Sequence, residues 1–247
     1  MQSTNRVPFE VDDSDIPAGC KVCGARQFGI CSALKASQLL HFSTVTRRRK
    51  IAQGETIYFE DDEVADYANI VAGAVKLTKL LSDGRQQIVG LQFAPEFVGK
   101  PFADTVSVSV EAATSVEVCV FPKVELEKML KQQPEFEHRL LEQAMVQLDD
   151  ARTWMVTLGR KTAQEKVASF LLLLLEHIGK PSPDNPAHKE FMLPLKRADI
   201  ADFLGLTLET VSRQMTKLRK MDIIDIEKNL DITVRDEPRL IAISGGE

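Results

Sequence analysis

Hydrophobic and polar residues follow a short alternating pattern in the first half of the chain and a helical period in the second half. Within residues 49–122, β-branched and apolar residues form short segments that are separated by turn residues, which is typical of β-strands. We predict strands over 56–59, 75–81 and 87–93. Many short strands spaced this closely indicate a β-sandwich or a β-roll.

Two further strands show a strict alternation of side chains. Valines and an alanine occupy every second position over 106–112, and valines do so again over 116–120. Successive side chains of a strand point to opposite faces. We therefore predict that Cys119 points outward, on the same face as Ser115 and Glu117.

From Pro134 onward the period becomes helical. Apolar positions recur at intervals of three and four residues, which is the spacing of a coiled-coil seam; a helix that packs on its own β-domain is the alternative. The predicted dimer seam consists of Leu141, Ala144, Leu148, Ala151, Met155 and Leu158. A second helix over 163–178 is apolar on nearly all sides at 170–175, which requires burial. We predict a loop for the proline-rich stretch 180–188.

A helix-turn-helix pattern follows this loop. A short helix opens at 199–201 and ends at Leu204, and Gly205 supplies the tight turn. Thr207 is then the N-cap of a second helix that runs to about Lys220. An ordinary pair of helices with a solvated charged face is the alternative interpretation.

A hairpin is predicted directly after this pair of helices. Its strands are 223–226 and 232–234, with a turn at Lys228 and Asn229. A hairpin in this place acts as the wing of a winged helix-turn-helix. The cap, the turn glycine, the basic balance and the hairpin together favour DNA binding.

The second helix presents side chains that are suited to reading bases. Glu209, Ser212 and Arg213 share one face near its N-terminal end. Arg213 can fork onto O6 and N7 of a guanine, Glu209 can accept a hydrogen bond from a cytosine N4, and Ser212 can reach a base or a phosphate. Lys217 and the two cations after it, Arg219 and Lys220, are predicted phosphate contacts.

Charge is distributed unevenly along the chain. The 247 residues carry a formal net charge of −5, yet residues 160–220 hold eleven Lys or Arg against seven Asp or Glu. This C-terminal part is therefore suited to an anionic partner such as double-stranded DNA. The longest apolar run, 170–175, is too short to cross a membrane, and we see no apolar signal sequence. We expect a cytoplasmic protein with no membrane partner.

Four cysteines form the remaining candidate site. Cys20, Cys23 and Cys31 lie in a flexible, irregular arm, and Cys119 lies on a strand. Thiolates are soft donors, and four of them satisfy either a tetrahedral zinc ion or a 4Fe-4S cluster. Structural zinc sites more often use two close pairs, whereas only one pair is close here. Unliganded or redox-active thiols, with Cys119 as a simple buried residue, are the third possibility.

The sequence offers no catalytic constellation. It contains no recognisable pair of carboxylates, no nucleophile with its base and no phosphate-binding loop. A metalloenzyme built on a β-roll needs inward histidines, but the histidines lie outside the predicted strands: His41, His138, His177 and His188. We therefore expect that the protein is not an enzyme.

The motifs of the helix-turn-helix resemble those of a known family. Asp199-Ile200, the Leu-Gly-Leu-Thr of 204–207 and the Glu-Thr-Val-Ser-Arg of 209–213, together with the seam helix, are similar to the CRP/FNR superfamily of bacterial transcription regulators. This resemblance implies an α+β fold with an N-terminal double-stranded, jelly-roll-like β-roll, a long dimerisation helix and a C-terminal winged helix-turn-helix. The implied boundaries are a cysteine-rich arm at 1–35, the sensor roll at 36–133, the dimerisation helix at 134–160 and the DNA-binding domain at 161–247.

Within this superfamily the chain resembles the oxygen-sensing FNR branch. The resemblance implies a 4Fe-4S cluster on Cys20, Cys23, Cys31 and Cys119, and the seven residues between Cys23 and Cys31 resemble a rhizobial-type subgroup. It also implies a homodimer that contacts RNA polymerase and reads a TTGAT inverted repeat through the reading face of its second helix. A dimeric regulator without a cluster, responding to thiol redox state or a small ligand, is the alternative.

The sequence differs from the cyclic-nucleotide branch and from FNR-branch members at specific positions. No arginine lies between Arg85 and Arg139, so the phosphate of a cyclic nucleotide would lack its fork of donors, and the Gly-Glu of that branch corresponds to Gly99-Lys100. We expect no cyclic nucleotide. In FNR-branch members an acidic seam residue opposes dimer formation, and the matching position here is Ala151.

Overall fold

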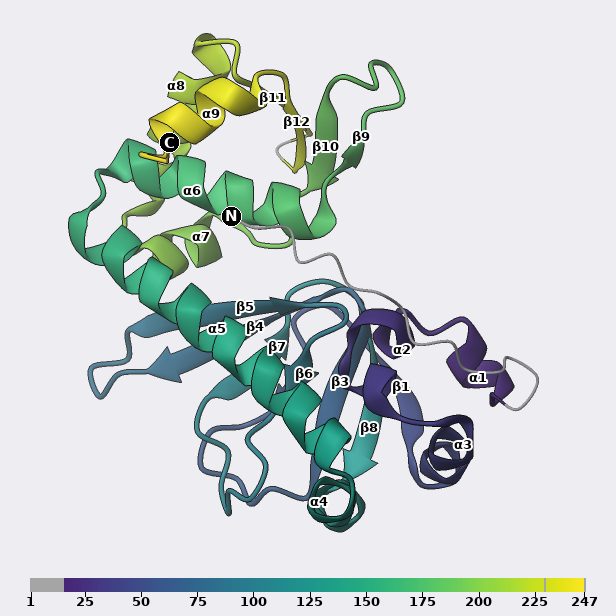
Figure 1. Ribbon diagram of the computed structural model, residues 1–247. Coiled ribbons are helices and arrows are strands. Elements are labelled where there is room, and N and C mark those ends of the chain that lie inside the picture. Colours follow the sequence, from purple (N-terminus) through teal and green to yellow (C-terminus); the bar gives the residue numbers. More distant parts are fainter. Residues whose placement is uncertain (1–15, 229, 247) are drawn as a thin grey trace. The chain divides into compact units, whose positions relative to one another are not determined.

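A computed structural model describes residues 16–246 with the exception of residue 229. The chain divides into two compact units, which we describe separately (Figure 1). The first unit runs to Thr78 and resumes from Leu91 to Leu148. The second comprises Lys79–Gly90 and the chain from Asp149 onward.

Two four-stranded antiparallel sheets form the centre of the first unit, with strands β4 and β5 extending into the second. One sheet has the order β1 (Arg47–Ile51), β8 (Val116–Pro122), β3 (Asp66–Ala72) and β6 (Phe97–Val98). The other has the order β2 (Thr56–Tyr58), β7 (Ser109–Ala112), β4 (Ala74–Leu80) and β5 (Gln86–Phe93). Consecutive strands are mostly not sheet neighbours, which is the topology of a roll and confirms the predicted β-roll.

The interior of the roll is filled by β-branched side chains. Val118 and Val120 of β8 are buried there together with Ala68 and Ile70 of β3. The valine alternation therefore marks the inner face of β8 as predicted. The predicted strand over 106–112 is shorter, because β7 begins only at Ser109. The backbone of Val106 instead pairs with Asp61 and Asp62.

The described part of the cysteine-rich arm, from residue 16 onward, is helical, which corrects the prediction of an irregular segment. It contains α1 (Ala18–Lys21), α2 (Gly24–Phe28) and the 3-10 helix η2 (Ile30–Ala33), and α3 (Ala36–Val45) follows it. Turns of four or five residues are too short to show a hydrophobic period. Ala25, Ile30 and Leu34 are nonetheless almost completely buried, so the arm packs as part of the first unit.

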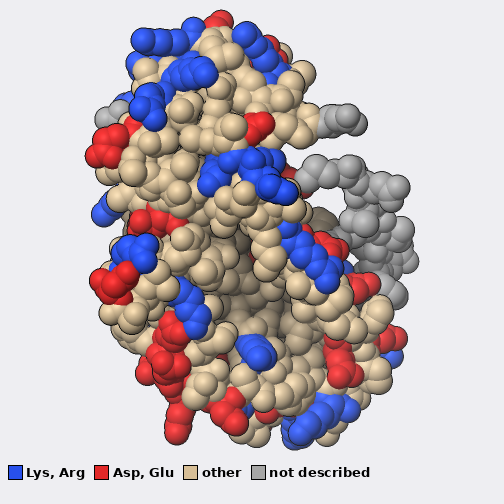
Figure 2. All heavy atoms as spheres, turned by 90° about the vertical axis from the view of Figure 1, so that its left-hand side faces the viewer, with Lys and Arg blue, Asp and Glu red and all other residues tan. Residues whose placement is uncertain are grey.

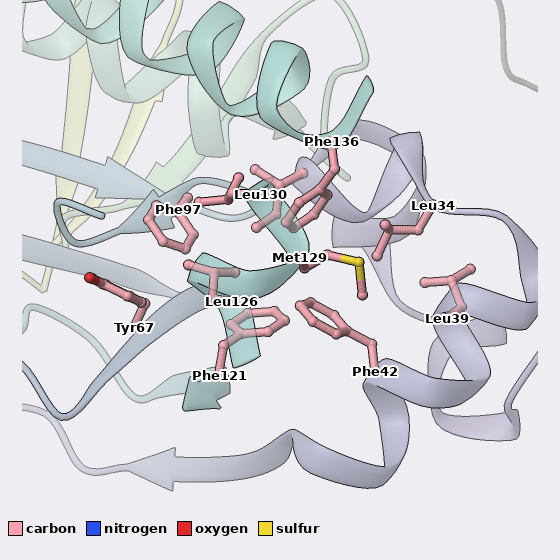
Figure 3. Packing of buried hydrophobic residues seen from close by; sticks show 11 residues of the cluster. Leu34, Leu39, Phe42, Tyr67, Phe97, Phe121, Leu126, Met129, Leu130 and Phe136 are labelled. Atoms are coloured by element: carbon pink, nitrogen blue, oxygen red, sulfur yellow. The ribbon is translucent and has the colours of Figure 1, made fainter. Parts of the chain in front are cut away.

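A second apolar cluster covers the outer face of the β1-β8-β3-β6 sheet. Phe42 of α3, Phe121 of β8 and Phe136 meet there (Figure 3), with the rings of Phe42 and Phe121 centred 5.1 Å apart. Ile30 and Leu34 of the arm belong to the same cluster. The outward face of β8 is therefore a covered surface rather than a solvated one.

Two helices follow the roll. Helix α4 (Lys123–Gln132) contributes to the outer cluster, and α5 (Pro134–Arg160) is the long helix that the heptad spacing predicts. Several apolar side chains of α5 stay exposed, among them Leu141 at 53% and Met155 at 71%. The structure describes no helix long and apolar enough to span a membrane.

The second unit contains the helix over 163–178, the helix-turn-helix and the hairpin that the sequence predicts. Its elements are α6 (Ala163–Ile178), β9 (Lys180–Pro181), β10 (Lys189–Met192), α7 (Arg197–Leu204), α8 (Leu208–Lys220), β11 (Ile224–Glu227), β12 (Asp231–Val234) and α9 (Glu237–Ile243). Phe203 of α7 anchors the core, with its ring 4.6 Å from Trp154 and 5.9 Å from Phe170. The predicted loop over 180–188 begins with the short strand β9, which pairs with β10.

Candidate functional site

The four cysteines come from three short helical turns and one strand. Cys20 lies in α1, Cys23 is the residue before α2, Cys31 lies in η2, and Cys119 lies on β8. All four are partly buried and none forms a disulfide. Cys31 and Cys119 both pack against the outer apolar cluster.

Charge interactions with the other cysteines affect the pKa values of Cys31 and Cys119. Burial raises the pKa of Cys31 well above its usual value, and the negative charges of the other three thiols raise it further. Burial also raises the pKa of Cys119 to about 11, with smaller increases from Cys23 and Cys20. Charge interactions weaken with separation. Cys31 and Cys119 also pack against one apolar cluster, so the arm lies beside the strand cysteine; metal binding by the four cysteines stays a prediction.

Arg48 connects the arm to β8 beside these thiols. It lies directly opposite Cys119 in the register of β1 and β8. Its Nη1 donates to Oε1 of Glu117 over 2.7 Å, and its Nη2 donates to the carbonyl oxygen of Gly19 over 2.6 Å. The guanidinium lowers the pKa of both Cys20 and Cys119 against the larger effect of burial.

A hydroxyl also stabilises the Cys119 thiolate. A hydrogen bond from the Thr46 side chain lowers the pKa of Cys119, although burial raises it by more. Sequence reasoning did not find Thr46 or Arg48. The only sequence feature that hints at them is the run of cations at 47–50, and its pairing with β8 depends on strand register.

Four thiols have the donor chemistry of a zinc site or of a 4Fe-4S cluster. Cys20 interacts with the cations Arg48 and Arg26, and Cys119 interacts with Arg48; these cations offset part of the negative charge that thiolates bring. Within the part of the chain that the structure describes, no group of three Cys, His, Asp or Glu side chains is placed to hold a metal ion.

The helix-turn-helix has the predicted boundaries with one difference. Helix α7 begins at Arg197, two residues earlier than predicted, and α8 ends at Lys220 as predicted. Gly205 between them has a φ of 60°, a left-handed conformation that glycine adopts without strain. The hydroxyl of Thr207 accepts a hydrogen bond from the backbone N–H of Thr210 over 3.2 Å, which confirms the N-cap.

One face of α8 is buried and the opposite face is open. Val211, Met215 and Leu218 pack inward, which fixes the rotation of the helix. Glu209 and Arg213 are consequently exposed, whereas Ser212 is partly buried. The pKa of Glu209 is lowered by hydrogen bonds from its own backbone N–H and from Thr207, so its carboxylate stays an acceptor.

Cations gather on the second unit around this helix. Figure 2 shows many Lys and Arg side chains over the upper part of the molecule, and Lys217, Arg219 and Lys220 of α8 are exposed. The Nζ of Lys217 donates to Oε1 of Gln164 on α6 over 2.6 Å. This predicted phosphate contact therefore has a protein partner in the free protein.

The predicted wing is present as an antiparallel hairpin. β11 and β12 pair from Ile224 opposite Val234 to Glu227 opposite Asp231, and β12 continues the sheet to β10 and β9. Residue 229 of the predicted turn lies outside the described residues.

The predicted dimer seam lies largely on exposed surface of α5. Leu141, Ala144, Leu148, Ala151 and Met155 are exposed, whereas Leu158 is partly buried. An exposed apolar stripe on a 27-residue helix is typical of a helix that pairs with a partner.

Two sequence families match different parts of the chain. A Crp-like helix-turn-helix domain matches residues 165–243, and a cyclic nucleotide-binding domain matches residues 48–133. The second match concerns the roll. The matched range contains no arginine after Arg85, so the expectation of no cyclic nucleotide stays a prediction.

Several known proteins are similar over most of the chain. A probable transcriptional activator of Rhizobium leguminosarum bv. viciae is 49% identical over 231 residues, which cover 94% of this chain and 95% of that protein. The transcriptional activator protein FnrL of Cereibacter sphaeroides is 36% identical, with 92% of each chain covered. The nitrogen fixation regulation protein FixK of Bradyrhizobium diazoefficiens is 38% identical, with 91% of this chain and 93% of that protein covered.

A solved structure agrees with these sequence relationships. FixK2 from Bradyrhizobium japonicum superposes with a TM-score of 0.75 at 32% identity, covering 82% of this chain and 99% of that chain. The roll, the long helix and the winged helix-turn-helix thus occur together in both proteins. With relatives of 36 to 49% identity along nearly its whole length, the chain belongs to the CRP/FNR family of transcription regulators and is not an enzyme.

Proposed function

We propose that this protein is a cytoplasmic, homodimeric transcription activator of the FNR/FixK type that senses oxygen through a 4Fe-4S cluster. The observation that carries the proposal is that Cys31 and Cys119 pack against one apolar cluster, while Arg48, opposite Cys119, bonds the carbonyl oxygen of Gly19 next to Cys20. Residues 88 or more positions apart in the sequence provide a complete set of four soft ligands. When bound, the cluster supplies a redox centre that oxygen can attack.

The chain's own residues hold the two halves of this site in place. Arg48 bonds the carbonyl next to Cys20 and the carboxylate of Glu117, two residues before Cys119. Ile30 and Leu34 belong to the outer apolar cluster and anchor η2 there. The ligands are therefore partly arranged before a cluster binds, which reduces the ordering that binding requires.

DNA recognition is assigned to the open face of α8. In a dimer, two such helices address half-sites about one helical turn apart. Arg213 reads a guanine, Glu209 accepts from a cytosine, and Ser212 contacts a base or a phosphate. These pairings support a TTGAT-type inverted repeat, and activation proceeds through contact with RNA polymerase as in the family.

Two alternative interpretations of the cysteines remain. In the first, the four cysteines bind zinc in place of the cluster. A dimeric regulator without a cluster, responding to a small ligand or to thiol oxidation, is the alternative function. The observation that favours thiol chemistry is the presence of four free thiols.

Binding to DNA with and without oxygen tests the proposal. Protein reconstituted anaerobically with iron and sulfide is titrated against a TTGAT inverted repeat and against a duplex with scrambled half-sites. We expect specific binding that is lost after exposure to air and regained only when iron, sulfide and reductant are added together. Recovery with a thiol reductant alone indicates thiol chemistry and contradicts the cluster.

A further inference from the structure

A row of side chains crosses the outer face of the sheet at the level of Cys119. In the register of β8, Cys119 lies opposite Arg48 of β1 on one side and opposite Asn69 of β3 on the other. Asn69 in turn lies opposite Phe97 of β6. Directly opposed residues of antiparallel strands share a face, with Cβ atoms roughly 4.5–5.5 Å apart. Asn69 is thus an immediate neighbour of the strand cysteine.

Asn69 is fully buried and unpartnered. Its exposed fraction is 0%, and neither Oδ1 nor Nδ2 has a hydrogen-bond partner among the residues that the structure describes. Tyr67, two residues earlier on the same face, differs because its hydroxyl donates to Oε1 of Glu127 over 2.7 Å. Buried amides without partners are rare, because each lost hydrogen bond is costly.

The surroundings of Asn69 indicate the chemistry of the missing partner. The adjoining members of its face, Tyr67 and Phe97, belong to the apolar cluster (Figure 3), against which Cys31 and Cys119 pack. Arg48, across the strand from Cys119, is already bonded to Glu117 and Gly19. Sulfur is therefore the acceptor that the sheet places beside the carboxamide.

We propose that Asn69 is a positioning residue whose carboxamide N–H donates a hydrogen bond to sulfur at the Cys119 corner of the cluster. This inference rests on the proposed cluster. A donor at this point fixes the Cys119 side chain in the orientation that binds iron. It also stabilises negative charge on sulfur and so favours the more reduced state of the bound cluster.

Replacing Asn69 should change the stability of the apoprotein and the stability of the bound cluster in opposite directions. Without the cluster, the carboxamide is an unsatisfied polar group in an apolar cluster. Replacing it by leucine, which has a similar shape, therefore stabilises the apoprotein. With the cluster, the same replacement removes a donor and destabilises metal binding. A residue that only fills space would shift both forms in the same direction.

The experiment compares the full-length wild-type chain with Asn69→Leu after anaerobic reconstitution with ferrous iron and sulfide. We expect the variant to lose its cluster to a chelator about tenfold faster and to have a more negative cluster reduction potential. Its apoprotein should unfold at a higher urea concentration than wild-type apoprotein. Gln92→Leu, which removes another buried amide that is not paired with a cysteine, should leave the potential unchanged.

A matched pair of variants separates the effect of the hydrogen bond from the effect of side-chain shape. Asn69→Thr and Asn69→Val have nearly the same shape, and only threonine keeps a donor. Asn69→Thr should retain a higher potential and slower chelation than Asn69→Val. Equal values in this pair, or wild-type values in Asn69→Leu, overturn the inference. If wild-type protein takes up no iron and sulfide, the proposed function itself fails, and the two failures are thereby distinguished.

Discussion

Arg48 is the side chain on which the connection between the arm and the sheet depends most directly. Its two hydrogen bonds, to Gly19 and to Glu117, have donor–acceptor distances of 2.6 and 2.7 Å. A fork of this kind requires the planar guanidinium, which lysine lacks. The residue is partly exposed, so the expected energies are those of a solvent-screened contact.

We predict that Arg48→Gln lowers the free energy of unfolding of the apoprotein by roughly 1 kcal/mol and speeds amide exchange in α1. Arg48→Lys should keep the charge beside the thiols but lose the fork, and so should show the same faster exchange. Hydrogen exchange measured by mass spectrometry checks both variants. Wild-type exchange in α1 of Arg48→Gln would show that other contacts hold the arm.

The raised pKa of Cys119 predicts a pH dependence of apoprotein stability. The thiol has a pKa of about 11 in the folded chain against an ordinary value of 9.0. Below pH 9 it is protonated in both states. Between pH 9 and 11 the unfolded chain releases the proton first, so the free energy of unfolding falls. Urea denaturation of wild type and Cys119→Ser should show a shallower decline for the variant; equal slopes would contradict the assignment.

Single residues differ in how far the sequence predicts them. The outward face of Cys119 follows from strict alternation along one strand, and β8 has that alternation. Arg48 and Asn69 become its neighbours only through pairing with β1 and β3. Strand order and register depend on long-range packing. The surroundings of the cysteine therefore could not be predicted from local pattern.

For the element α8, the orientation of the helix about its own axis determines which side chains can contact DNA. Three buried residues fix that orientation and leave Arg213 and Lys217 exposed. We predict that Arg213→Ala lowers the binding free energy by about 1 to 3 kcal/mol at the guanine position and relaxes base discrimination there.

Lys217→Ala should weaken binding to all sequences alike and lower the slope of the logarithm of the binding constant against the logarithm of salt concentration by about one unit. Titrations of specific and scrambled duplexes at several salt concentrations measure both effects.

Arg213→Lys is the control for charge. It keeps the cation and loses the bidentate fork, so it should relax discrimination and leave the salt slope unchanged. The assignment of roles on α8 fails if Arg213→Ala binds the inverted repeat normally while Lys217→Ala loses base preference.

Long elements, which contain several repeats of the hydrophobic period, were predictable from the sequence, whereas short elements were not. Helix α6 has the predicted bounds, because its N-cap Thr162 and sixteen helical residues leave a clear pattern. The arm helices α1, α2 and η2 comprise only four or five residues each. Ile30 of η2 packs in the outer cluster and Ala25 of α2 is buried, and such tertiary contacts leave no local signature.

At the scale of the whole molecule, α5 predicts how the chain assembles. Its exposed apolar stripe includes Leu148 and Met155, with Ala151 between them. An acidic residue at position 151 would face its symmetry mate across a dimer axis, at a cost on the order of a few kcal/mol. Alanine removes that repulsion. We therefore predict that apoprotein remains at least partly dimeric, with oxygen control acting within the assembled dimer.

Sedimentation velocity of apoprotein at micromolar concentration tests this prediction. Wild type should contain dimer, and Ala151→Asp should shift the population towards monomer. Thr153→Asp, an exposed change off the seam, should sediment as wild type. A purely monomeric apoprotein that Ala151→Asp leaves unchanged would place the control of association elsewhere.

The iron and acid-labile sulfide content of protein isolated without oxygen decides whether the four cysteines hold a cluster. We predict about four iron and four sulfide per wild-type chain, with loss of the cluster in each single change of Cys20, Cys23, Cys31 or Cys119 to serine. The Cys119→Ser variant is the most informative, because this thiol alone lies outside the arm. A full complement of iron and sulfide in Cys119→Ser would contradict the four-cysteine assignment, and zinc without sulfide in wild type would contradict the cluster.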